Sequence, residues 1–352
     1  MGIQAGLKND KGIRGFFRGN AGRELRIEGG GRVKLCVIGN GMIVRRLLQD
    51  VRDLSEVEVT GICVRSASLE KGQALAEEFG IPAVYTDYGA CLADGAFDTV
   101  YIGIANHLHA AYAKQALEAG KHVVCEKPFT LTAEEARELA GLAKARGLFL
   151  WEAFKIPYSP VFQAVQAHLD QVGRIRMVQC NYSRISSRYP QYERGEVHAA
   201  FDPSCGGGCL YDINSYNLHF VTALFGKPEE VRYIARRGFN GVDTCGTAIL
   251  RYPDFDALCT GAKDSTSPCF AVIQGTKGYI RVEGPLSGAY QAELTAPEGT
   301  VCLAEDPARG TLTDEVREFA RQLAAGDRDA CYGMLEHSVL MMEVLEEAGK
   351  QG

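Results

Sequence analysis

Long apolar runs and an excess of positive charge are both missing from this sequence of 352 residues. A membrane-spanning helix needs about 20 mainly apolar residues, so we expect no membrane partner. The 38 Lys and Arg residues are outnumbered by 44 Asp and Glu residues. Because a nucleic-acid-binding domain usually carries a basic face, we expect no nucleic-acid partner either. The hydrophobic content of 46% is ordinary for a folded globular protein.

Closely spaced cysteine pairs are missing as well, although the chain has 12 cysteines. The nearest two, Cys205 and Cys209, flank three glycines. Since no apolar secretory segment precedes them, we interpret the cysteines as reduced thiols of a cytoplasmic protein. A zinc site of Cys205, Cys209 and a distant His is the less favoured alternative, because structural zinc usually takes four ligands at recognisable spacing. We therefore expect no metal.

Residues 1–31 contain nine glycines, and their six basic residues outnumber three acidic ones. Such a segment buries too little apolar area to offset the entropy lost on ordering, which predicts a disordered tail. An alternative is that the natural chain starts at Val33, with residues 28–31 translated from a ribosome-binding sequence.

The length exceeds that of one typical domain, and the pattern of elements changes near residue 152. We therefore predict two domains, at residues 32–152 and 153–352. In the first, short apolar runs alternate with amphipathic segments, which indicates a parallel α/β sheet of the Rossmann type. The predicted strands are 33–38, 57–64, 98–104, 122–125 and 148–151, and the predicted helices are 42–53, 68–79, one ending before Gly120, and 132–147.

The second domain is rich in β-type runs with few helices between them, which indicates a large, mostly antiparallel open sheet. The fold class is thus α/β in both domains. The predicted strands are 175–182, 231–236, 245–252, 257–263, 270–274 and 279–282, and the helices are 159–169, 211–224 and two that start near 314 and 335.

A glycine-rich turn, Gly-Asn-Gly-Met-Ile-Val at 39–44, joins the first predicted strand to its helix. Gly39 allows a tight turn, and Gly41 lets a pyrophosphate approach the N–H groups of the helix start at Met42 and Ile43. The third position of the motif is Val44, so helix and strand are expected to pack slightly further apart. The alternative is a glycine turn that binds nothing.

The second strand ends without the acidic residue that usually binds the adenine ribose of NAD. Arg65 and Ser66 follow it instead, and an arginine can pair with a 2′-phosphate. This favours NADP over NAD as the cofactor. The alternative is that Arg65 is a solvated loop residue.

The segment Glu126, Lys127, Pro128 resembles the signature of the glucose-fructose oxidoreductase, inositol dehydrogenase and rhizopine-catabolism (Gfo/Idh/MocA) family. An Asn-x-x-His run at 106–109, a Thr-x-x-Glu helix start and a Gly-Gly-Gly-x-x-x-Asp segment at 206–212 follow the family's order. The resemblance covers residues from Val33 to the C-terminus. Residues 148–153 and Tyr216 are most similar to the dihydrodiol dehydrogenase branch.

The resemblance implies hydride transfer between a nicotinamide and a small sugar-like hydroxy or keto compound. It implies that Lys127 is the essential lysine beside the nicotinamide, and that Asn106, His109 and Glu126 line the cofactor. It also implies that a second subunit covers the open sheet, so we expect a dimer or larger homo-oligomer. Two positions depart from the common pattern: Ala105 replaces a Pro, and Tyr216 replaces a catalytic His, as in the dihydrodiol branch.

We expect Lys127, Asp212 and Tyr216 to form the catalytic group. Asp212 and Tyr216 are i and i+4 on one predicted helix and so share a face. A neighbouring Lys⁺ is expected to lower the pKa of Tyr216 and make it a workable base. His219 is either a substrate contact or a packed helix residue. Two loop arginines, Arg184 and Arg188, are more readily interpreted as solvated than as substrate contacts.

The function predicted from these features is that of an NAD(P)-dependent oxidoreductase acting on a hydroxyl or carbonyl group of a sugar, glycoside or related diol. The alternative is a non-enzymatic sensor that binds dinucleotide to regulate a partner protein. Such a sensor would be free to lose Lys127, Asp212 and Tyr216. All three are present, which favours the enzyme.

Overall fold

The computed structural model describes residues 32–309 and 311–351. The predicted tail, residues 1–31, lies outside this part of the chain. Six parallel strands form the first sheet in the order β3-β2-β1-β4-β5-β6. They are β1 (Val33–Ile38), β2 (Val57–Cys63), β3 (Ala83–Tyr85), β4 (Thr99–Ile102), β5 (His122–Glu126) and β6 (Leu150–Ala153). The strand order reverses between β1 and β4, as in a Rossmann fold, so the predicted class is confirmed.

Helices cover both faces of this sheet, and two of them have the capping residues that the sequence predicted, whereas the short helix at 88–93 was not predicted. They are α2 (Met42–Val51), α3 (Leu69–Phe79), α4 (Tyr88–Ala93), α5 (His109–Glu118) and α6 (Ala133–Arg146). At the start of α6 the side chain of Thr132 accepts from Glu135 N, and the Glu135 carboxylate accepts from Thr132 N. The left-handed Gly80, with φ 68°, ends α3 as expected.

The second sheet has eight strands in the order β14-β13-β12-β11-β7-β10-β9-β8. Neighbouring strands are antiparallel except for the parallel pair β7 and β10. The strands are β7 (Ile175–Ser183), β8 (Glu230–Arg237), β9 (Asp243–Arg251), β10 (Asp256–Ala262), β11 (Phe270–Gly275), β12 (Tyr279–Glu283), β13 (Gln291–Ala296) and β14 (Gly299–Glu305). The mostly antiparallel sheet is therefore confirmed.

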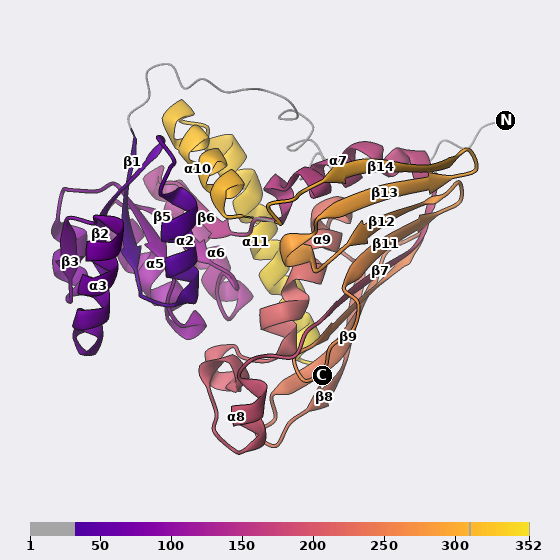
Figure 1. The fold of residues 1–352 in the computed structure, drawn as a ribbon, viewed down its shortest axis with the longest axis horizontal. Helices are drawn as coiled ribbons and strands as arrows, with labels where there is room; N and C mark the ends of the chain where they lie inside the picture. Colours follow the sequence, from indigo (N-terminus) through magenta and orange to yellow (C-terminus); the bar gives the residue numbers. More distant parts are fainter. Residues whose placement is uncertain (1–31, 310, 352) are drawn as a thin grey trace.

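One face of the second sheet packs against helices, so every second residue along a strand points to this face and is buried. Val178 and Cys180 of β7, for example, are buried, whereas Met177 points to the opposite side and is exposed. The helices of this part are α7 (Pro160–His168), α8 (Tyr189–Glu193), α9 (Ser215–Phe225), α10 (Thr313–Ala325) and α11 (Arg328–Gly349). Figure 1 shows α9 and α11 between the two sheets and α8 in a separate lobe below them.

The prediction of one continuous α-helix at 211–224 is wrong for its first turn. A π-helical turn, Leu210–Asn214, precedes α9. Asp243 at the start of β9 fixes this turn, because its carboxylate oxygen accepts from Leu210 N at 2.7 Å and from the Tyr233 hydroxyl at 2.6 Å.

The last two helices return to the first sheet. The Trp151 indole donates to the Gln322 side chain on α10 at 2.7 Å, and Ala133 N donates to Glu346 on α11 at 2.9 Å. Of these two helices, α11 contacts β6 of the first sheet and β8 of the second, whereas α10 packs against α2 and α11. Among the described residues, none of the helices is long and apolar enough to cross a membrane.

Candidate active site

The turn between β1 and α2 has the geometry that a pyrophosphate needs. Gly39 has φ +113°, and a Cβ there would lie 2.4 Å from the backbone oxygen of Gly103, so only glycine fits. A Cβ on Gly41 would have nothing within 4 Å, so its backbone is open to a ligand. The start of α2 at Met42 and Ile43 has neither a side-chain cap nor an acidic first-turn residue among the described residues. Its N–H groups therefore suit an anion.

Val44, at the third position of the glycine motif, is fully buried against β4. A Cβ on Gly103, just after β4, would lie 2.8 Å from a Val44 methyl carbon. Because Gly103 has no side chain, the valine fits at close range, and the expected wider spacing is not needed.

Three further cofactor positions predicted from the sequence lie at the same carboxyl edge of the sheet. Arg65 and Ser66 follow β2 and are exposed. Asn106 follows β4 and is half-buried, and its side chain donates to Gly206 O at 3.3 Å. This edge, at the point where the strand order reverses, is where dinucleotides bind in such sheets.

Glu126 and His109 lie behind this edge instead of on it. The Glu126 carboxylate is buried and accepts from the Tyr101 hydroxyl and, at 3.2 Å, from Lys127 N. The buried His109 ring lies 2.9 Å from Pro128 O and 3.2 Å from Ile104 O. Both side chains therefore support the loops after β4 and β5. This differs from the expectation that they line the cofactor, because the first turn of α5 points His109 into the core.

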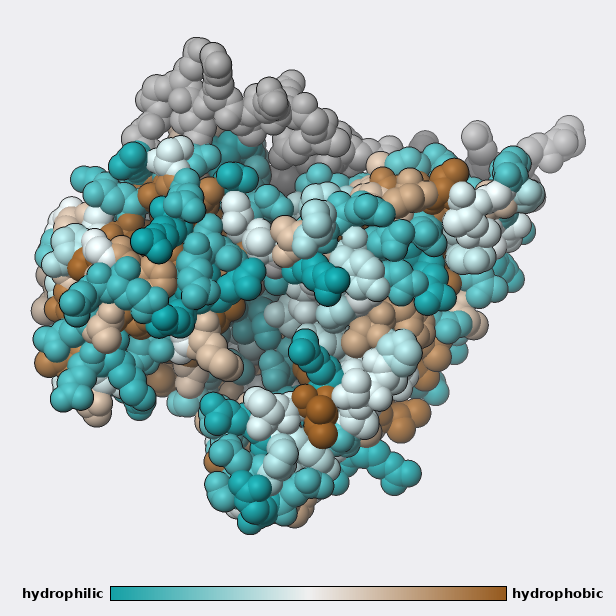
Figure 2. Space-filling model, in the orientation of Figure 1, coloured by the Kyte–Doolittle hydropathy of each residue, from teal (hydrophilic) through white to brown (hydrophobic). Residues whose placement is uncertain are grey.

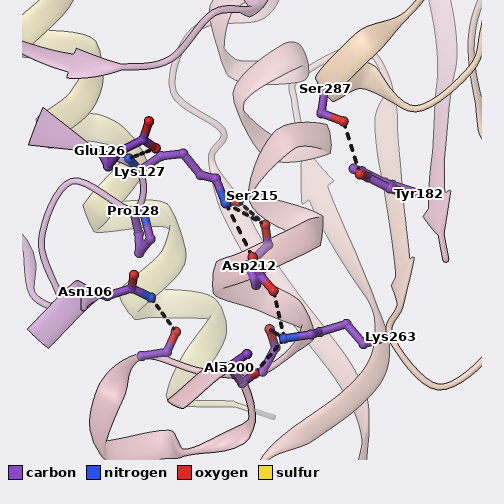
Figure 3. A network of polar contacts seen from close by, with 12 residues as sticks. Asn106, Glu126, Lys127, Pro128, Tyr182, Ala200, Asp212, Ser215, Lys263 and Ser287 are labelled. Carbon is purple, nitrogen blue, oxygen red and sulfur yellow. Dashed lines mark hydrogen bonds and ion pairs between the residues drawn. The ribbon is translucent and has the colours of Figure 1, made fainter. Parts of the chain in front are cut away.

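Lys127, Asp212 and Tyr216 are brought together from the two sheets. The Lys127 ammonium donates to Asp212 O at 3.1 Å and lies 3.4 Å from Asp212 Oδ1 (Figure 3). It also lies 4.9 Å from the centre of the Tyr216 ring. Lys127 is 16% exposed, so it retains access to a ligand. The space-filling view shows a hollow between the two halves of the molecule (Figure 2).

The π-helical turn changes how Asp212 and Tyr216 come to this point. Asp212 lies inside the turn and Tyr216 lies in the first turn of α9. They are therefore not stacked one α-helical turn apart, as the i and i+4 spacing predicted. Isolated π turns are frequent at functional sites, where they redirect a side chain.

The charges at this centre follow from burial and from neighbouring groups. Burial disfavours the Asp212 carboxylate, but Lys127 and Lys263 outweigh it and lower the pKa of Asp212 to about 2. Burial also disfavours the Lys127 ammonium, but the anionic form of Tyr216, with Asp212 and Glu126, raises the pKa of Lys127 above its usual value. At neutral pH the centre therefore has an ammonium beside a carboxylate.

The expected direction of the pKa shift of Tyr216 is wrong. Burial raises the pKa of Tyr216, and the neighbouring Lys127 offsets this only in part. Tyr216 is therefore a neutral phenol at pH 7. Its hydroxyl has no hydrogen-bond partner within residues 32–309 and 311–351.

Two residues at this centre were not predicted from the sequence. Lys263, directly after β10, is 1% exposed and its ammonium lies 2.8 Å from Asp212 Oδ2. Tyr182 of β7 places its ring 5.9 Å from that of Tyr216, and its hydroxyl accepts from Ser287 at 3.1 Å. A lysine ending a buried strand is the one sequence signal that points to Lys263.

Three other candidates lie in different surroundings. His219 is buried, lies 3.4 Å from the Glu152 carboxylate and stacks on Phe154, so it is a packed residue. Arg184 is exposed and Arg188 is half-buried, both in the loop after β7.

The 12 cysteines are all free thiols. Across the described ranges, 32–309 and 311–351, no group of three or more His, Cys, Asp or Glu residues is placed to hold a metal ion. The zinc alternative at Cys205 and Cys209 therefore has no support.

Comparison with known proteins connects this geometry to a family. A model described as "Oxidoreductase family, NAD-binding Rossmann fold" matches residues 33–154, and one described as "GFO/IDH/MocA C-terminal domain" matches residues 162–281. The chain is 32% identical to scyllo-inositol 2-dehydrogenase (NADP(+)) IolU of Bacillus subtilis (strain 168), over 91% of this chain and 97% of that enzyme. It is 27% identical to trans-1,2-dihydrobenzene-1,2-diol dehydrogenase of Homo sapiens, over 89% of this chain and 95% of that one.

A solved structure has the same fold. KijD10, a 3-ketoreductase from Actinomadura kijaniata in complex with NADP and TDP-benzene, matches with a TM-score of 0.79 and 24% identity, over 91% of this chain and 98% of that chain. Nothing in these comparisons supports the sensor alternative. The chain belongs to the Gfo/Idh/MocA family of NAD(P)-dependent oxidoreductases.

Proposed function

We propose that this protein is an NADP-dependent dehydrogenase or reductase that interconverts a secondary alcohol and a ketone on a sugar, cyclitol, glycoside or related diol. The observation that carries the proposal is the Lys127 ammonium, held by Asp212 and placed over Tyr216 at the carboxyl edge of the Rossmann sheet. A lysine and a phenol next to each other offer two protons to one substrate oxygen.

The catalytic roles follow from the hydrogen bonds already present. Bound nicotinamide supplies the hydride donor or acceptor. The Lys127 ammonium has three protons, of which two can be directed at Asp212 O and Oδ1, so one is left for a substrate oxygen. The unpartnered Tyr216 hydroxyl then gives its proton to a carbonyl oxygen in reduction and takes it back in oxidation. Asp212 holds the lysine in place.

The preference for NADP is proposed from the end of β2, where Arg65 and Ser66 are exposed and no carboxylate repels a 2′-phosphate. The name of the Bacillus subtilis relative, which specifies NADP(+), supports this choice.

The substrate class is proposed from the two relatives. The name of one specifies an inositol and that of the other an arene-derived diol, so both act on a carbon ring with neighbouring hydroxyl groups. A ring hydroxyl is therefore the group that we expect to be oxidised here.

We also propose that the open face of the second sheet is covered by a second copy of the chain. This face is lined by Ile234, Ile249 and Leu258 on adjacent strands, and Ile234 is 69% exposed. The cytoplasmic location proposed from composition is supported by the free cysteines, which suit a reducing compartment.

The test is a turnover screen. NADP⁺ and NAD⁺ reduction is followed with inositols, sugars, glycosides and diols, and NADPH oxidation with the matching ketones. We expect turnover with at least one ring alcohol, and loss of that turnover in Lys127→Ala. Activity that survives Lys127→Ala would contradict the proposed centre.

A further inference from the structure

Lys263 is a buried lysine whose ammonium has no proton left for a substrate. It lies 2.8 Å from Asp212 Oδ2, donates to Ala200 O at 2.6 Å and lies 3.5 Å from Gly208 O. An ammonium has three protons, and these three oxygens take them. The ring of Phe201 packs against the ammonium as well, with its centre 4.4 Å from Nζ. Lys263 therefore does not touch the reacting atoms.

The backbone of Lys263 is fixed independently of its side chain. Its N–H donates to Thr244 O at 2.8 Å, and its carbonyl accepts from Ser186 N at 2.8 Å. The ammonium therefore extends from a rigid strand end, next to β9. A buried ammonium is costly unless it is paired. Here the paired charge is the Asp212 carboxylate.

Asp212 is shared between two lysines (Figure 3). Its Oδ2 faces Lys263, and its Oδ1 and backbone oxygen face Lys127. With only one cation, the carboxylate could rotate to it with both oxygens. With two, each oxygen is committed, and Lys127 keeps a fixed direction.

Lys263 also connects the glycine-rich segment to this carboxylate. Ala200 and Gly208, whose carbonyls face the ammonium, are themselves joined, because Gly208 N donates to Ala200 O at 3.0 Å. Gly206 between them accepts from Asn106 on the dinucleotide side. One ammonium therefore links the second sheet, the segment 200–208 and the centre that holds Lys127.

We infer that Lys263 is a positioning residue for the proposed reaction, acting through Asp212 to hold Lys127 in its productive direction and charge state. This rests on the proposed function for its kinetic part only. The groups that face Asp212 are Lys127 directly after β5, Lys263 directly after β10 and Tyr216 of α9, with Cys209 and Asp243 next to the turn. Of these, Lys263 is the cation that no substrate displaces.

The test removes the charge of Lys263 and keeps a hydrogen-bond donor in its place. Lys263→Gln is compared with wild type and with Lys227→Gln, a matched change at an exposed lysine. Aspartate is labelled with ¹³C at Cγ, the Asp212 signal is assigned through Asp212→Asn, and its titration is followed in the protein without dinucleotide. We expect the pKa of Asp212 to rise by about one unit or more in Lys263→Gln, and to stay unchanged in Lys227→Gln.

Kinetics then separate positioning from packing. We expect Lys263→Gln to lower kcat by about tenfold or more, while KM and dinucleotide affinity stay within about twofold of the wild-type values. In an Asp212→Asn background, the same change should lower kcat by less than about twofold. Lys263→Arg, which keeps the charge, should recover most of kcat. An unchanged Asp212 titration in Lys263→Gln, or an equal loss of kcat in both backgrounds, would overturn the inference.

The titration needs no turnover, so it decides on Lys263 even if no substrate is found and the proposed function fails. If Lys263→Gln does not fold, Lys127→Gln decides, because it leaves Lys263 as the lysine that faces Asp212. A midpoint for Asp212 below the ordinary value of about 3.9 in Lys127→Gln supports the inference, and a midpoint at or above that value overturns it.

Discussion

At the scale of single residues, the centre combines a lysine that stays charged with a phenol that stays neutral. The Lys127 ammonium is held by Asp212, whereas Tyr216 is desolvated with no described hydrogen-bond partner for its hydroxyl. At neutral pH this centre is therefore set up to give protons, which suits reduction of a carbonyl. The sequence predicted these three residues as the catalytic group but not their protonation states, because a pKa depends on burial that no motif records.

The pH dependence of alcohol oxidation follows from the raised pKa of Tyr216. Oxidation needs the phenolate, so its rate is expected to rise with pH and not to level off below about pH 10, the usual tyrosine value. Reduction needs the phenol and is expected to stay flat from about pH 6 to 9. The profile of kcat/KM in each direction measures this, with Tyr216→Phe as control. A plateau for oxidation at or below pH 8 would show that the phenol is not desolvated in the working enzyme.

Cofactor choice depends on Arg65, which is exposed after β2. A charge-assisted hydrogen bond contributes about 1.5–3 kcal/mol, so we expect NADPH to bind about tenfold to a hundredfold more tightly than NADH. Arg65→Ala should remove most of that difference and leave NADH affinity unchanged. Fluorescence titration with both dinucleotides measures it. Equal affinity of the wild type for the two would refute the preference.

At the scale of elements, the sequence predicted those helix ends that depend on residues close together in the chain. The capping box of Thr132 and Glu135 and the left-handed Gly80 were visible in the sequence and are present. Three strands, β3, β13 and β14, were not predicted. The three-residue β3 is too short for a period, β13 is poor in residues that favour strands, and the edge strand β14 is largely exposed. The π-helical turn was also missed, since its cause is Asp243, far away in the sequence.

The contact between Gly103 and Val44 gives an element-scale prediction. Gly103→Ala would place a Cβ 2.8 Å from a Val44 methyl carbon and push α2 away from β4. Overpacking of this kind typically costs about 1–3 kcal/mol. We expect a lower melting temperature and weaker dinucleotide binding.

A double variant tests the cause of that effect. Adding Val44→Ala removes the clashing methyl groups, so Gly103→Ala should cost less in this background than alone. Thermal melting and dinucleotide titration of the four proteins measure the coupling. Additive losses would mean that the helix does not depend on this contact.

At the scale of the whole molecule, the second sheet has one covered face and one open face. The covered face packs against α9 and α11, while the open face presents Ile234 together with Met177 and Tyr279. Composition and strand pattern predicted both sheets. They did not predict that α10 and α11 return to the first sheet, because those contacts join residues 171 and 213 positions apart.

The open face gives the assembly prediction. We expect light scattering to report a dimer or larger oligomer at micromolar concentration, because a second copy removes the exposed apolar side chains from water. Ile234→Glu should shift the protein toward monomer, whereas Phe239→Glu, at an exposed residue just after β8, should not. A monomeric wild type would contradict the proposed interface.

The most direct measurement of the central claim is single-turnover hydride transfer in Lys127→Ala and Tyr216→Phe, each saturated with dinucleotide and substrate. A positioned proton-transfer group contributes about 10²–10⁴ in rate, so each variant should lose about that much. Dinucleotide affinity should change little in Tyr216→Phe, because Tyr216 belongs to the second sheet's side of the centre. A wild-type transfer rate in Lys127→Ala would contradict the assignment of this centre. A wild-type rate in Tyr216→Phe would show that the phenol takes no part in the reaction.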